Sequence, residues 1–268
     1  MKHEIFGIDF SAAKNPGDKI WISKGHLKRN RITVEYTESA KSLWGNLGSK
    51  EVYYKKIRNL VLENPSGVFG MDFSFSLPEE CLDGATWNGF ISNIHKNFPN
   101  AEYFRKHCLK MTGSREKRRK VELEMGAPLS PYNLWIYKQT YHGMRDILAP
   151  LMDSVSIIPY TQAIPERPWI LEVYPGLILK ERNIYIPYKG NKNESTKTKN
   201  RDLMVDELTS KSFNGLNLEF DESCIENMKK NSGGDALDSF MALLVTYRFY
   251  KQFLDNKKRN CFKMYKTK

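Results

Sequence analysis

The sequence has little cysteine, and its cysteines are not arranged to form a site. Cys81, Cys108, Cys224 and Cys261 are scattered along 268 residues, form no CxxC pair and have no histidine at zinc-finger spacing. This pattern argues against a disulfide scaffold and against a zinc finger. It is typical of reduced cysteines in a cytosolic protein.

Long hydrophobic runs are absent as well. No segment approaches the ~20 apolar residues that a membrane-spanning helix needs, and the apolar stretch after Met1 to Glu4 is too short for a signal peptide. The sequence also shows no Ser/His/Asp order, no glycine-rich phosphate loop and no metal spacing among its five histidines. We therefore expect a cytoplasmic protein with no membrane partner.

The charge balance is the unusual bulk property of the chain. Lys and Arg number 42 and Asp and Glu number 31, which gives a net charge of +11 and a pI near 9.3. A basic surplus favours nucleic acid, another polyanion or an anionic surface as a partner. Solubility alone also explains such a surplus, so the charge leaves both interpretations open.

Two apolar stretches end in the same three residues, Asp-Phe-Ser. They are Glu4 to Ser11 and Gly67 to Ser74, and both are rich in strand-forming residues and too short for a helix. If the two strands lie side by side, Asp9 and Asp72 are neighbours at one edge of the sheet. The alternative is that each aspartate only begins a turn.

The predicted elements follow a specific order in the first quarter of the chain. Alternating residues predict strands at Lys19 to Ser23 and Arg31 to Thr37, which continue the first strand as an antiparallel meander. A helical pattern then covers Glu38 to Glu63 in two pieces. The strand ending at Asp72 follows and can lie parallel to the first, an order that does not fit a uniform βαβ repeat.

The remainder is predicted to be mainly helical with two more strands. Ser130-Pro131 is read as an N-cap followed by proline at the first helical position. Ile184 to Lys199 is read as a loop whose most mobile part is Lys189 to Thr198. The predicted helices lie near Thr86–Asn97, from Ser130 to about Leu151, at Arg201–Lys211 and from Asp235 to about Leu254, and the strands at Val155–Ile158 and Trp169–Gly176.

Asp235 and Asp238 lie three residues apart at the start of the last predicted helix, so they share one face. Acids in a first helical turn often serve only as caps. Together with Asp9 and Asp72 they would form a self-repelling carboxylate cluster, which divalent cations make tolerable. Two such ions ~4 Å apart can drive phosphodiester cleavage.

Other residues have weaker claims to the site. Glu172, inside its predicted strand, is an auxiliary acid, either a metal ligand, a hydrogen-bond acceptor behind the ligands or a partner for a buried base. The basic run that includes Arg115, Arg118 and Arg119 is either a solvated face or a grip on phosphates, with tyrosines nearby for stacking on bases. Ser11 and Ser74 follow the strand acids and are candidates to orient a phosphate or a metal-bound water.

The motifs together resemble an uncharacterised family of predicted RNase-H-like nucleases, the domain of unknown function four-two-nine. The resemblance implies an RNase-H-like (resolvase-type) α/β fold with a mixed sheet, and a carboxylate site. It runs from near residue 4 to about 250. The motifs that carry it are Gly7-Ile8-Asp9-Phe10-Ser11-Ala12-Ala13, Gly70-Met71-Asp72-Phe73-Ser74-Phe75-Ser76-Leu77-Pro78, Glu172-Val173-Tyr174-Pro175-Gly176 and Asp235-Ala236-Leu237-Asp238-Ser239.

We accordingly predict one domain over residues 1–255, with a helical insert at about 80–153, and a basic tail at 256–268. The predicted activity is that of a Mg²⁺- or Mn²⁺-dependent nuclease acting on DNA or RNA. Its catalytic residues would be Asp9, Asp72, Glu172, Asp235 and Asp238, and all of these except Glu172 would bind metal. One alternative is a nucleic-acid-binding module without catalysis. The other is an ATP-dependent phosphotransferase of the actin-like superfamily, which would need two such domains with glycine-rich phosphate loops in both.

Overall fold

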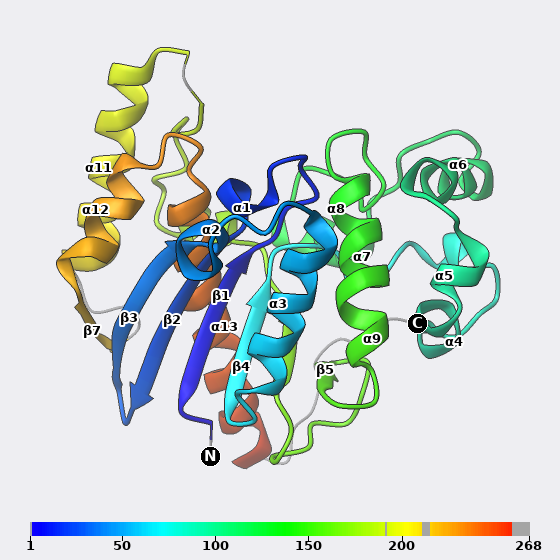
Figure 1. Cartoon of the computed structure of the whole chain (residues 1–268), viewed down its shortest axis with the longest axis horizontal. Coiled ribbons are helices and arrows are strands. Elements are labelled where there is room, and N and C mark those ends of the chain that lie inside the picture. Colours follow the sequence, from blue (N-terminus) through cyan, green and yellow to red (C-terminus); the bar gives the residue numbers. More distant parts are fainter. Residues whose placement is uncertain (1, 191, 211–214, 259–268) are drawn as a thin grey trace.

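Seven strands form one mixed sheet in the order β5-β6-β4-β1-β2-β3-β7 in the computed structural model, which describes residues 2–190, 192–210 and 215–258 (Figure 1). β1 pairs antiparallel with β2, and β2 with β3, whereas the other pairings are parallel. The predicted meander followed by a strand parallel to the first is confirmed, and this arrangement is compatible with an RNase-H-like fold. The strands are β1 (Glu4–Asp9), β2 (Trp21–Lys28), β3 (Arg31–Ser39), β4 (Gly67–Met71), β5 (Ser156–Ile158), β6 (Trp169–Glu172) and β7 (Asn217–Phe220).

Helices cover both faces of the sheet (Figure 1). The helical elements that precede β5 are α1 (Pro16–Lys19), α2 (Ala40–Trp44), α3 (Lys50–Leu62), the 3-10 turn η1 (Glu79–Leu82), α4 (Trp87–Ser92), α5 (Ile94–Asn97), α6 (Ala101–Met111), α7 (Lys120–Met125), α8 (Tyr137–His142), the π-helical η2 (Gly143–Leu148) and α9 (Ala149–Leu151). Those that follow β6 are α10 (Gly176–Glu181), α11 (Glu194–Ser210), α12 (Glu222–Lys230) and α13 (Asp235–Lys258).

The two faces of the sheet belong to two separate hydrophobic cores, because successive strand residues point to opposite sides. In β1, Phe6 belongs to the core that α3 and η2 complete, and Ile5 to the core that α13 completes. Most of the buried residues of α13 have no exposed surface. This helix therefore lies directly on the sheet, and its first turn has a fixed position relative to the ends of β1 and β4.

Several predictions of local structure are wrong. The helix expected from Ser130-Pro131 begins at Tyr137, because the preceding residues form turns. The loop expected to reach Lys199 ends before Glu194, where α11 starts. Helices α10 and α12 and strand β7 were not predicted.

Three of the four cysteines lie in the part of the chain that the structure describes. Cys81, Cys108 and Cys224 are buried and free, whereas Cys261 and most of the predicted basic tail lie outside the described residues. Among the helices described, none is long and apolar enough to cross a membrane.

Candidate carboxylate site

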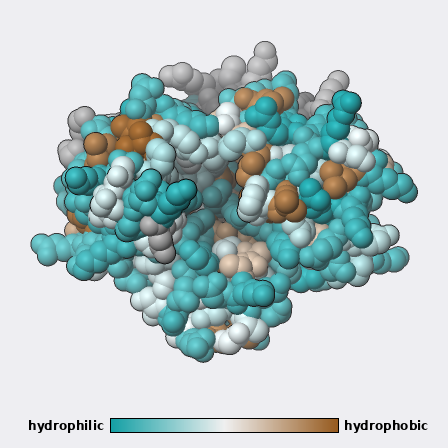
Figure 2. All heavy atoms as spheres, turned by 90° about the horizontal axis from the view of Figure 1, so that it is seen from above, coloured by the Kyte–Doolittle hydropathy of each residue, from teal (hydrophilic) through white to brown (hydrophobic). Residues whose placement is uncertain are grey.

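The parallel register of β1 and β4 brings Asp9 and Asp72 to the same edge of the sheet. Ile8 pairs with Met71, so the two aspartates follow at equivalent positions. The Asp72 N–H donates to the Ile8 carbonyl at 3.0 Å and extends the pairing to the last residue. Figure 2 looks onto this edge and shows a mainly hydrophilic surface with a recess near its centre.

Close packing of α13 on the sheet brings Asp235 and Asp238 to the same edge. A Cβ atom at Gly7 would lie 2.1 Å from both the Leu243 nitrogen and the Ser239 oxygen, so the backbone of β1 and that of α13 approach without a side chain between them. The Ser239 hydroxyl also hydrogen-bonds the Ser23 hydroxyl of β2 at 2.9 Å. Gly7, two residues before Asp9, thus allows α13 and its two aspartates to approach β1.

Asp9 and Asp72 are held in an environment that disfavours their charged forms. Burial, and then the neighbouring Asp238 carboxylate, raise the pKa of Asp9 well above its usual range. The same causes raise the pKa of Asp72 to about 7, with a further contribution from Glu172. Among the described residues, neither carboxylate has a hydrogen bond or an ion pair to a side chain or backbone group.

The two aspartates on α13, in contrast, are paired with lysines. Asp238, which is 3% exposed, accepts hydrogen bonds from the Tyr188 hydroxyl and the Lys189 ammonium group. Asp235 accepts one from Lys19 at 2.9 Å. Burial lowers the pKa of Lys189, but the Asp238 and Asp9 carboxylates outweigh this effect and raise it above its usual value. Lys189 therefore supplies positive charge to the whole carboxylate group.

Glu172 belongs to a neighbouring network rather than to the group of four aspartates. Its carboxylate accepts hydrogen bonds from the Phe75 N–H at 2.9 Å and from the Arg119 guanidinium at 3.0 Å. Arg119 is only 8% exposed and also binds Glu122. Glu172 is close enough to influence Asp72, and its contacts fix the segment that follows β4.

The hydrogen bonds that the structure describes for the remaining predicted residues join them to groups other than the four aspartates. The Ser11 hydroxyl accepts from the Ala13 N–H at 3.2 Å, in a local turn, and Ser74 is partly buried. Arg115 and Arg118 are exposed, and Arg118 donates to the Ala127 carbonyl at 3.3 Å. Arg119 is enclosed by carboxylates, as described above.

A pocket of about 410 Å³ opens beside the acids. Asp72 and Asp238 line it, together with the aromatic residues Tyr174, Tyr185 and Tyr188. Its volume falls in the usual range of small-molecule sites, roughly 300–1,000 Å³. Tyr188 and Lys189 were not predicted as site residues, because the polar stretch that contains them is typical of a loop. The only signal there is an aromatic residue and a lysine next to a glycine.

The carboxylate oxygens of the four aspartates suit a hard divalent cation. Their side chains, however, are not arranged around a common point where such a cation would bind. No group of three or more His, Cys, Asp or Glu side chains in the part of the chain that the structure describes is placed to hold a metal ion. Lys189 and Lys19 instead neutralise two of the four aspartates. Asp9 is buried and Asp72 half-buried, both lack such a partner among the described residues, and their carboxylate oxygens are the ligands that Mg²⁺ and Mn²⁺ prefer.

Comparison with protein-family models, with curated proteins and with solved structures gives no match for this chain. The family resemblance of its motifs therefore remains a prediction. A function has to be inferred from the chemistry of the site itself.

Replacing Asp72 by asparagine is expected to stabilise the metal-free protein at neutral and higher pH. The folded state keeps a proton on Asp72 up to a pKa of about 7, whereas the unfolded chain loses it near pH ~3.9. Stability is therefore lost as the pH rises from about 4 to about 7, and asparagine removes this loss. The gain should be on the order of 3–4 kcal/mol at pH 8 and below about 1 kcal/mol at pH 4.

Urea unfolding in EDTA at both pH values measures this difference. Asp153→Asn, at an exposed position, is the matched control and should be neutral at either pH. An equal effect of Asp72→Asn at pH 4 and pH 8 would contradict the assignment.

Proposed function

We propose that this protein is a metal-dependent nuclease of the RNase-H-like class, in which Asp9, Asp72 and Asp238 hold Mg²⁺ or Mn²⁺, with Asp235 beside them. The observation that supports this most is the pair of strand-end carboxylates, the buried Asp9 and the half-buried Asp72, which have raised pKa values and no cationic partner of their own among the described residues. Such a pair is stable either protonated or with a cation bound.

Each residue has a role that follows from the element that carries it. Asp9 and Asp72 emerge from paired central strands, and Asp235 and Asp238 from the first turn of α13, so all four are held by rigid elements. Glu172, which Arg119 holds in place, is an auxiliary acid that accepts the Phe75 N–H and so fixes the segment after Asp72. When bound, two divalent ions activate water and stabilise the leaving oxygen of a phosphodiester.

The pocket beside the acids supports a nucleotide-sized substrate unit. Lys189 lies in its wall and carries a positive charge suited to a phosphate oxygen. Tyr174 and Tyr185 contribute aromatic surface to the same wall. The chain's net charge of +11 favours the approach of a polyanion.

The test is calorimetric titration of Mg²⁺ and Mn²⁺ into the wild-type protein and the Asp9→Asn/Asp72→Asn variant, with a panel of short DNA and RNA substrates for cleavage. We expect metal binding and cleavage by the wild type and a loss of both in the double variant, with cleavage reduced at least ~10³-fold. Asp153→Asn should behave as the wild type.

Two other outcomes are informative. Metal-dependent cleavage that survives in the double variant would show that the active site lies elsewhere. Nucleic-acid binding without any metal binding or cleavage by the wild type would overturn the nuclease and leave a binding module.

A further inference from the structure

Trp135 is the most exposed of the large apolar side chains described. Its side chain is 83% exposed, and the adjacent Leu134 is 59% exposed. Tryptophan is normally well buried on average, because its large apolar surface is unfavourable in water. The two residues lie in the turns before α8, where the sequence analysis had predicted a helix.

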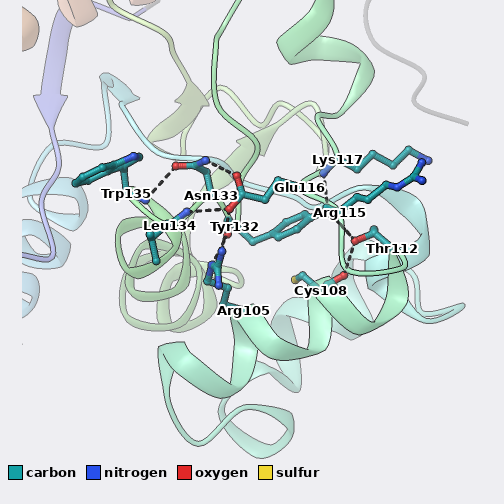
Figure 3. Close-up of polar contacts among 10 residues, drawn as sticks. All are labelled: Arg105, Cys108, Thr112, Arg115, Glu116, Lys117, Tyr132, Asn133, Leu134 and Trp135. Atoms are coloured by element: carbon teal, nitrogen blue, oxygen red, sulfur yellow. Dashed lines mark hydrogen bonds and ion pairs between the residues drawn. The ribbon is translucent and has the colours of Figure 1, made fainter.

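The turn that carries these two residues is rigidly held. The Glu116 carboxylate accepts hydrogen bonds from the Asn133 amide, from the Leu134 N–H at 3.1 Å and from Arg105 at 2.9 Å. The Asn133 side chain in turn accepts from the Trp135 N–H at 3.0 Å. Figure 3 shows this network, from which the indole extends away. The backbone at Trp135 is thus fixed before any contact is made, which lowers the ordering cost of binding.

A basic loop lies against the same turn. The Tyr132 hydroxyl accepts from the Lys117 N–H at 2.7 Å and donates to the Arg115 carbonyl at 2.9 Å (Figure 3). Arg115, Lys117 and Arg118 are all exposed on this loop. Positive side chains that track a backbone, next to an aromatic face, are the combination that binds single strands.

Helix α8 connects this surface to the carboxylate site. The Gln139 side-chain amide donates to the carbonyl of Asp72. Gln139 follows Trp135 by four positions, so their Cα atoms are at most about 15 Å apart. A nucleic-acid strand that contacts Trp135 is therefore close to the segment that carries Asp72.

We propose that Trp135 stacks on an unpaired base of a single-stranded nucleic acid whose phosphates contact the loop of Arg115, Lys117 and Arg118. An exposed ring face needs a partner with an exposed ring face, and a base within a duplex is covered by its neighbours. This inference rests on the proposed function, since it takes nucleic acid as the substrate, and it specifies the class as single-stranded.

The test is fluorescence anisotropy with labelled 15-nucleotide dT and rU strands and a DNA duplex of equal length, all in EDTA so that no cleavage occurs. Trp135→Ala is expected to weaken single-strand binding about 5- to 100-fold, and Trp135→Phe should retain most of the affinity. Leu203→Ala, at an exposed position on α11, should leave the affinity unchanged.

Unchanged single-strand affinity in Trp135→Ala would overturn the proposal. The exposed turn would then be a binding surface for a protein partner. Equal weakening of duplex binding would overturn it too, because the contact would then not read an unpaired base. Loss of cleavage in Asp9→Asn with normal binding of single-stranded nucleic acid would support both the nuclease and the role of Trp135. If the wild type shows no cleavage but binds strands through Trp135, only the nuclease fails.

Discussion

Gly7→Ala is expected to destabilise the protein by about 3–5 kcal/mol, a large share of the stability of a typical domain. The added methyl group would lie 2.1 Å from two backbone atoms of α13, the Leu243 nitrogen and the Ser239 oxygen. Backbone atoms cannot rotate away as a side chain can, so the helix must move from the sheet. Chemical denaturation of the two proteins measures the loss.

Gly89→Ala is the matched control, because the nearest atom to its added methyl group is the Thr86 Oγ1 at 3.2 Å. It should change stability by less than about 1 kcal/mol. If Gly7→Ala unfolds at the same denaturant concentration as the wild type, β1 and α13 are not in the contact described. If the protein binds metal as we propose, the variant should also bind it more weakly, since Asp238 moves with the helix.

Arg119→Met is expected to cost about 3–5 kcal/mol, because it leaves Glu122 and Glu172 without the buried cation that both now share. The defect should shrink as the pH falls toward 4, where protonation removes the uncompensated charges. Urea unfolding at several pH values tests both statements.

The neighbouring Arg118→Met supplies the control. Arg118 is exposed, and its side chain donates only to the Ala127 carbonyl in the contacts described, so the expected effect is below about 1 kcal/mol. Equal losses for the two arginines would show that the buried network contributes nothing beyond an ordinary surface interaction.

The central part of the fold could be predicted from the sequence because its signals are local. The residues before Asp9 and Asp72 are apolar strand formers, and both stretches became paired strands in register. The last helix begins at Asp235, as its two acids indicated. The predicted break in the helical region after β3 also exists, between α2 and α3.

The features that could not be predicted depend on contacts between distant segments. The helix expected after Ser130-Pro131 is delayed to Tyr137 because Glu116 binds the backbone and side chains of the turn between them. The Ser130 hydroxyl, expected as a cap, has no hydrogen-bond partner among the described residues. Lys189 looked like part of a polar loop, since nothing in its local sequence identifies Asp238 as its partner.

The place of α13 in the chain has a consequence for how the protein folds during synthesis. This helix follows all seven strands in sequence, and the hydrogen bond between Ser23 and Ser239 joins residues 216 positions apart. Contacts of such separation form late, because a long loop must close first. During translation, the part of the sheet that α13 covers, on β1, β2 and β4, is therefore uncovered until this helix has been synthesised. The core on this face and the group of aspartates are completed in the same step, so a chain that stops before α13 lacks the complete form of both.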